Sequence, residues 1–268
     1  MNEEIKIEEK IKLHNAIMII GLSGWVNAGE VSTFVIKHLT DKLEAKKFGE
    51  ISHENFHDYI VQRPLVSIEQ GVIQSYISPR SDLFYWRNGE KKSDLLLLLG
   101  PEPHLNWSGY AESVLKLAEE LGVKKIYTMG SFLADISHEI ETPITGGVNN
   151  KKLAAELKKV GVELTNYRGP TSVYSEILWR GRAKKMNVVS LWCAVPMYVR
   201  GLYPEAVYSL LRKVMQLTGL KFDLKDLKEK AGSFKEQLEK ETMGQPQLRD
   251  SVGNMRTRPQ EKEITYIF

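Results

Sequence analysis

The chain has 268 residues, of which 42% are hydrophobic and 26% are charged, a composition typical of a globular protein with a sizeable core. Its 37 Lys and Arg residues nearly balance its 34 Asp and Glu residues, and the charges are interspersed, which argues against a nucleic-acid-binding surface. No apolar run is long enough to span a bilayer, and the charged amino terminus lacks the apolar core of a signal peptide. We therefore expect a cytoplasmic protein without membrane contact. The single cysteine, Cys193, lies in an apolar run and is expected to be buried and inert.

The first recognisable unit is a strand at residues 16–20, a glycine-rich loop (GLSGWVNAGE, residues 21–30) and a helix with apolar residues at helical spacing. Asn27 and Glu30 resemble a capping box for that helix. Gly24, Asn27 and Gly29 place backbone N–H groups where an anion could bind. The loop is neither a dinucleotide fingerprint nor a Walker loop, since the phosphate-binding lysine is missing. The alternative is a bend whose glycines let strand and helix pack closely.

Residues 51–86 have a β-like pattern, with short strands predicted at 56–62, 65–68, 72–77 and 83–86. Asn88-Gly89 is a strong turn signal that precedes the next strand. Five consecutive leucines, residues 95–99, lack polar alternation and predict a central strand of a parallel sheet, buried on both faces.

The loop after the leucine run carries Glu102, His104 and Trp107, and Ser108 is a candidate cap for a helix that continues to Leu121. The carboxyl ends of parallel strands are the edge where ligands tend to bind. Glu102 or His104 is therefore a candidate acid or base. In the structural alternative, Glu102 caps the following helix and Trp107 seals the sheet edge.

Further alternation of strands and helices favours an α/β sheet. Strands are predicted at residues 125–129, 162–164 and 188–195, and helices at 150–160, after 172, at 203–218 and at 222–238. Residues 132–148 are predicted to be a long irregular loop that serves a function or contacts a subunit. His138-Glu139 begins a zincin-like pattern, but Thr142 stands where the second His would be, so no metal is expected.

The carboxyl terminus combines a polar stretch, residues 243–263, with an apolar end, residues 264–268. The polar stretch predicts a flexible linker. Tyr266, Ile267 and Phe268 predict a docking peptide or an edge strand on a neighbouring subunit. The chain is thus expected to comprise an α/β domain (residues 1–220), a helical segment (221–242) and a tail (243–268).

Several motifs occur together in an order that resembles the second proteasome assembly chaperone family. They are GLSGWVNAGE (21–30), Arg63-Pro64, LLLLLGPEPHLNW (95–107), GSFLADISHEIETPITGG (130–147), YRGPTSVYSEIL (167–178) and LWCAVPMYV (191–199). The resemblance implies a three-layer α/β fold with a mixed, mostly parallel sheet similar to nucleoside phosphorylases, followed by carboxy-terminal helices. It also implies a homo-oligomer whose partners are proteasome α subunits or the 20S particle. Archaeal relatives dock through a carboxy-terminal hydrophobic-Tyr-any tail, whereas Tyr266 is third from the end here.

Two functional hypotheses follow. The first is a non-catalytic assembly chaperone or proteasome-binding protein, without cofactor or catalytic residue, anchored by Tyr266, Ile267 and Phe268. The alternative is a small-molecule-binding enzyme, phosphorylase-like or ligase-like, that uses the strand-edge loops. Its ligand crevice would be formed by Gly24, Asn27, Gly29, Glu102, His104, Trp107 and Glu139.

Overall fold

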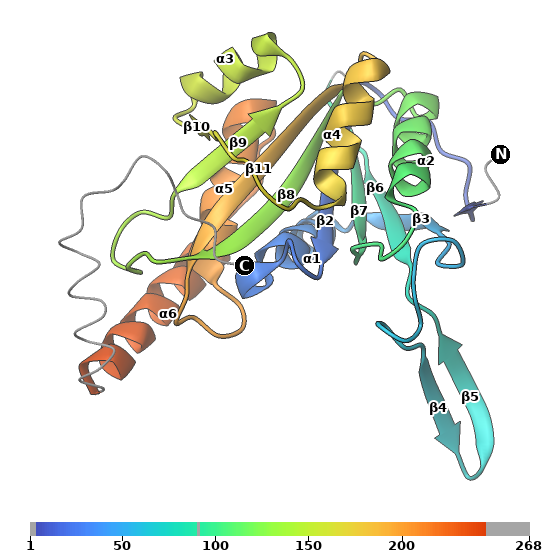
Figure 1. Cartoon of the computed structure of the whole chain (residues 1–268), viewed down its shortest axis with the longest axis horizontal. Helices are drawn as coiled ribbons and strands as arrows, with labels where there is room; N and C mark the ends of the chain where they lie inside the picture. Colours follow the sequence, from blue (N-terminus) through green and yellow to red (C-terminus); the bar gives the residue numbers. More distant parts are fainter. Residues whose placement is uncertain (1–3, 90–91, 245–268) are drawn as a thin grey trace.

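The computed structural model describes residues 4–89 and 92–244 (Figure 1). Within these residues, nine strands form one sheet in the order β1-β3-β6-β7-β2-β8-β11-β9-β10, and β4 and β5 form a separate hairpin. The strands of the sheet are β1 (Ile5–Ile7), β2 (Ile17–Ser23), β3 (Lys46–Ile51), β6 (Ser81–Trp86), β7 (Leu95–Pro101), β8 (Lys125–Ala134), β9 (Ile144–Val148), β10 (Glu163–Leu164) and β11 (Asn187–Pro196). The hairpin strands are β4 (Leu65–Glu69) and β5 (Val72–Ile77).

Six α-helices and one short 3₁₀ helix complete the described part of the chain. They are η1 (Ala28–Glu30), α1 (Val31–Leu43), α2 (Trp107–Glu120), α3 (Lys151–Lys159), α4 (Val173–Ala183), α5 (Pro204–Thr218) and α6 (Lys225–Gly244). None of the described helices is long and apolar enough to cross a bilayer.

The sheet lies between two helical layers (Figure 1). Helices α1, α5 and α6 bury apolar side chains against one face, and α2 and α4 bury theirs against the other. On β7, Leu95 and Leu97 belong to the first core and Leu96 and Leu98 to the second, all without exposed surface. A strand covered on both faces needs apolar residues at every position, which confirms the interpretation of the leucine run. Cys193 is buried in the first core, as predicted.

The centre of the sheet is parallel, because β2 pairs in parallel with β7 and β8, and β8 with β11. Antiparallel pairs add β6, β3 and β1 on one side and β9 on the other. The sheet as a whole is therefore mixed rather than mostly parallel.

Three local predictions are wrong. Residues 56–62 form turns rather than a strand. Residues 132–148 are not irregular throughout, because β8 continues to Ala134 and β9 begins at Ile144. Helix α2 is capped by Asn106 instead of Ser108, since the Asn106 side chain accepts the N–H of Gly109 at 3.1 Å.

Gly21 explains how closely α1 approaches β2. A Cβ atom at this position would lie 2.2 Å from the backbone oxygen of Ser32 and 2.5 Å from Cγ1 of Ile36. The Ser32 hydroxyl in turn accepts the N–H of Leu22 at 3.0 Å. The glycine is therefore required for tight packing of strand and helix, the second of the two roles considered for this loop.

We expect Gly21→Ala to lower the free energy of unfolding by about 1 to 3 kcal/mol, because the added methyl group must displace the backbone of α1. Gly232→Ala is the matched control, since a Cβ there meets no neighbour and alanine favours the helix. Urea unfolding followed by circular dichroism measures both. Equal stability of Gly21→Ala and the unmodified chain would contradict the packing account.

Candidate functional site

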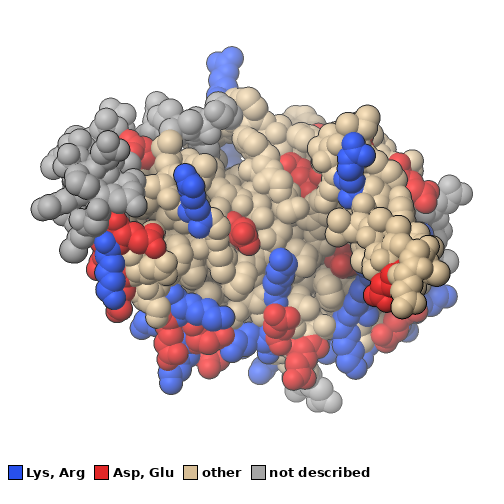
Figure 2. All heavy atoms as spheres, turned by 90° about the horizontal axis from the view of Figure 1, so that it is seen from below, with Lys and Arg blue, Asp and Glu red and all other residues tan. Residues whose placement is uncertain are grey.

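Most of the predicted site residues lie on loops at one edge of the sheet. Strands β2, β7, β8 and β11 run in the same direction and end at this edge. Strand β3 also ends there, because β3 and β7 both pair antiparallel with β6. The edge therefore carries the loops after β2, β7 and β8 together with the segment that leads to the β4–β5 hairpin. Figure 2 views the molecule from this side and shows Lys, Arg, Asp and Glu side chains along its lower rim.

Glu102 joins three segments at the edge. Its carboxylate accepts the N–H of Val173, the first residue of α4, at 3.0 Å, and also accepts the backbone N–H of Trp25. Its own N–H donates to the oxygen of Ser23 at 3.0 Å. A Cβ atom on Gly24 would lie 3.4 Å from Cβ of Glu102, so these two predicted residues are neighbours.

The electrostatic state of Glu102 follows from its position. Burial raises the pKa of the carboxyl above its usual value, and the hydrogen bonds from Val173 and Trp25 oppose that rise. Both partners are backbone donors of the chain itself. In this arrangement Glu102 links loops to a helix, which is closer to the structural alternative than to acid or base chemistry, although the helix it meets is α4 and not α2.

We expect Glu102→Ala to lower the free energy of unfolding by about 1 to 3 kcal/mol, because two N–H groups lose their acceptor. Glu102→Gln keeps an acceptor and stays neutral. The raised pKa means that the folded state binds the Glu102 proton more tightly than the unfolded state does. The free energy of unfolding that the Glu102 carboxyl contributes therefore falls as the pH rises above the usual glutamate pKa. Glu102→Gln should therefore equal or exceed the unmodified chain at neutral pH in thermal unfolding. A loss as large as that of Glu102→Ala would contradict this role.

Asn27 and Gly29 also make contacts within the chain. The Asn27 side chain accepts the N–H of Thr33 at 3.0 Å and donates to its hydroxyl oxygen at 3.1 Å, so it satisfies a backbone N–H in the first turn of α1. The capping box with Glu30 does not form, because the N–H of Asn27 donates to the oxygen of Gly24. Gly29 has φ +57°, and a Cβ there would lie 3.0 Å from Cβ of Tyr203.

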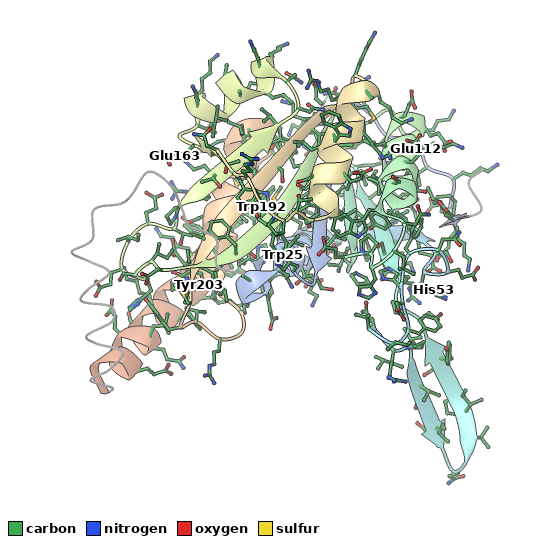
Figure 3. The ribbon with its side chains drawn as sticks, in the orientation of Figure 1. Trp25, His53, Glu112, Glu163, Trp192 and Tyr203 are labelled. Carbon is green, nitrogen blue, oxygen red and sulfur yellow. The ribbon has the colours of Figure 1, made fainter. Side chains whose placement is uncertain are left out.

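Trp107 and Trp25 place aromatic rings at this edge. The indole N–H of Trp107 donates to the oxygen of Pro103 at 2.6 Å, which ties the loop to the start of α2. The ring of Trp25 meets Trp192 edge-on at 6.2 Å between centroids, and Figure 3 shows the two together in front of the sheet. Trp107 is half-buried and packs against the second core, and its sealing role stays a prediction.

His104 belongs to a histidine cluster at the root of the hairpin. Its Nδ1 accepts the N–H of Asp58 at 3.2 Å, and its ring meets the ring of His57 at 5.5 Å. His53 stacks on Tyr59 at 5.3 Å, and Figure 3 places His53 beside the segment that leads into the hairpin. His53 and His57 were not predicted as site residues, because no sequence motif marks them. A tertiary contact brings the two segments of the cluster together, because the backbone N–H of His104 donates to the backbone oxygen of Phe56.

His57 is the buried member of this cluster. Within the part of the chain that the structure describes, its Nδ1 has no hydrogen-bond partner. Burial lowers the pKa of His57 to about 4, and the neighbouring His104 and His53 add to the effect. His57 is therefore neutral at physiological pH.

Because the pKa of His57 is lower in the folded state than its unfolded value of 6.5, the neutral ring stabilises the fold at pH values above 6.5. This stabilisation is lost as the pH falls from 6.5 toward 4. We expect acidification through this window to destabilise the His57 segment by about 1 to 3 kcal/mol. His57→Gln should flatten the loss, whereas substitution of the exposed His14 by Gln should not. Hydrogen exchange of residues 53–59 as a function of pH measures the effect. An unchanged pH dependence in His57→Gln would contradict the assignment.

Glu139 lies in the loop after β8, beside α6 and away from the hairpin. The segment around it forms a groove of about 360 Å³ with α5 and α6, lined by residues that include His138, Glu139, Tyr203 and Phe234. The backbone oxygen of Glu139 accepts a hydrogen bond from Lys235 at 3.5 Å, and Nδ1 of His138 lies 2.7 Å from the hydroxyl oxygen of Tyr198. Figure 3 places Tyr203 near α6 and His53 near the hairpin.

The residues of the predicted crevice thus divide into four groups. Gly24, Glu102 and Trp107 lie near the start of α4 or α2, and Asn27 and Gly29 lie at the start of α1. His104 joins the hairpin root, and Glu139 joins α6. Residues 4–89 and 92–244 contain no group of three His, Cys, Asp or Glu side chains arranged as metal ligands. The predicted anchors Tyr266, Ile267 and Phe268 lie outside the described residues.

Comparisons with known proteins agree with the motifs. The model of the PAC2 family matches residues 21–242. A crystal structure of a PAC2 family protein from Streptomyces avermitilis has a TM-score of 0.80 at 28% identity, covering 88% of this chain and 99% of that one. A proteasome-assembly chaperone homologue from Mycobacterium tuberculosis has a TM-score of 0.80 at 26% identity, with the same coverage. PbaB of Pyrococcus furiosus, an archaeal proteasome activator, shares the fold with a TM-score of 0.70 at 23% identity, covering 88% of this chain and 97% of PbaB.

Proposed function

Because the chain belongs to the PAC2 family, we propose that it is a non-catalytic proteasome assembly chaperone or proteasome-binding protein that acts as a homo-oligomer in the cytoplasm. The observation that carries the proposal is the match, over nearly the whole length of both chains, to a proteasome-assembly chaperone homologue. The fold shared with an archaeal proteasome activator supports the same class of partner.

The geometry of the sheet edge favours this role over the enzymatic alternative. Glu102, Asn27 and Trp107, the polar groups best placed for chemistry, hydrogen-bond to the chain's own backbone. His104 and Glu139 occupy separate surroundings at the hairpin root and beside α6. An acid and a base that act on one substrate must lie within reach of the same atoms. The likeness to nucleoside phosphorylases stays a prediction.

The proposed mechanism is multivalent attachment. Helix α6 packs against α5 through buried residues such as Leu227 and Leu238, and the last described residue of the chain is Gly244 at its end. Residues 264–268 follow as the proposed docking peptide, with Tyr266, Ile267 and Phe268 as anchors. A homo-oligomer presents several such peptides, and linkage raises their effective concentration by a factor on the order of 100 or more when the geometry allows simultaneous binding.

We expect the intact chain to capture purified 20S proteasome or free α subunits, and the chain truncated after Glu263 to lose at least about tenfold in affinity. Tyr266→Ala should reproduce most of this loss, whereas Thr265→Ala, the matched control, should not. Pull-down followed by surface plasmon resonance makes the measurement. Capture of intact and truncated chains with equal affinity would disprove the tail mechanism, and failure of both to bind would disprove the proteasome role.

A further inference from the structure

The β4–β5 hairpin is the most exposed apolar element of the described chain. Its two strands pair with each other and with no strand of the main sheet, and it projects from the domain (Figure 1). Large apolar side chains on the hairpin and on the segment before it are between 47% and 82% exposed. They are Ile60, Val61, Leu65, Val66, Ile68, Val72, Ile73, Tyr76 and Ile77.

The two faces of the hairpin differ in character. Cross-strand partners share a face, and the register pairs Val66 with Tyr76 and Ile68 with Ile73. These four residues make one face apolar from root to tip, and we call it the apolar face. The opposite face pairs Ser67 with Ser75 between Leu65–Ile77 at the root and Glu69–Val72 at the tip.

An isolated two-stranded hairpin is marginally stable in water, because it has no core to bury its side chains. The four side chains of the apolar face are each between 54% and 61% exposed. Together they form a contiguous apolar patch on the order of 400 Å², a size that often marks an interaction site on a monomer. The apolar face is therefore suited to a specific protein contact.

The charge pattern indicates which kind of partner covers it. Between Leu65 and Ile77 the single charged residue is Glu69, and no lysine or arginine protects the strand edges. Proteins that leave a strand pair exposed for part of their lifetime usually place charges or prolines on it, because bare edges aggregate. An uncharged, apolar contact is typical of permanent subunit interfaces. A permanent contact of this kind suits a second copy of the chain better than a proteasome subunit that is captured and released.

We propose that the β4–β5 hairpin is an intersubunit arm that packs its apolar face against a second copy of this chain. The inference rests on the homo-oligomeric state proposed above and names the element that holds the oligomer together. The arm leaves the domain beside the histidine cluster. Its root is fixed by contacts of that cluster, which comprises His53, His57 and His104. Its projection keeps the contact away from the domain's own two cores.

The test is the mass in solution of two matched double variants of the full chain. Ile68→Lys with Ile73→Lys places charge on the apolar face, and Ser67→Lys with Ser75→Lys places the same charge on the opposite face. Sedimentation equilibrium at micromolar concentration should give a multiple of 30.6 kDa for the unmodified chain and for the serine control. The isoleucine variant should dissociate at least 100-fold more readily. The unmodified chain and both double variants should have the same circular dichroism spectrum, since the hairpin contributes to neither core.

Direct contact is tested by photo-crosslinking. Cys193 is buried, so Ile73→Cys can be labelled selectively with a benzophenone maleimide. Irradiation should yield a product of twice 30.6 kDa that contains two copies of the chain. Failure to form it would overturn the arm.

The outcomes separate this inference from the proposed function. An oligomer that survives the isoleucine substitutions would overturn the arm and leave the homo-oligomer standing. If the same variant stayed oligomeric but lost proteasome capture, the apolar face would instead bind the proteasome, which also overturns the arm. A monomeric unmodified chain would overturn both the arm and the oligomeric part of the proposed function.

Discussion

The structure depends on burial of the central parallel strands on both faces. Leucines 95–98 alternate between two cores, so helices must cover the sheet on both sides. Parallel strands also end together, which brings the loops after β2, β7 and β8 to one edge. The same direction of β3 brings the hairpin to that edge. One constraint of packing therefore places both the strand-edge loops and the hairpin.

At this edge the polar groups are used to fasten loops to helices. Glu102 binds the start of α4 and the Trp25 loop, and Asn27 binds the Thr33 N–H in the first turn of α1. An unpaired backbone N–H at a helix start is costly, so these side chains have a structural task that competes with chemistry. The hairpin that leaves this edge carries the largest group of exposed apolar side chains in the described chain. This distribution supports the proposed contact with other protein chains.

The sequence predicted the elements whose signals are local and missed those that depend on distant contacts. The leucine run and the helices α3 and α6 were predicted because apolar runs and helical periodicity are visible in a short window. Strand β9 was missed because it is defined by pairing with β11, and its Gly146 admits Leu157 of α3 rather than marking a loop. The hairpin strands were predicted, but their exposure was not, since alternation of residues does not reveal whether another chain covers them. The Glu102 contact was likewise invisible, because its partner Val173 lies 71 positions away.

The central claim is that the apolar hairpin is a covered element of an assembled protein. The most direct measurement is hydrogen exchange of the backbone amides of residues 65–77 in the full chain, at concentrations where subunits would assemble. The account predicts that the amides bonded across β4 and β5 are protected nearly as well as those of the central sheet, and that dilution removes this protection first. Exchange of the hairpin at the rate of an unstructured peptide, independent of concentration and with the central sheet still protected, would contradict it.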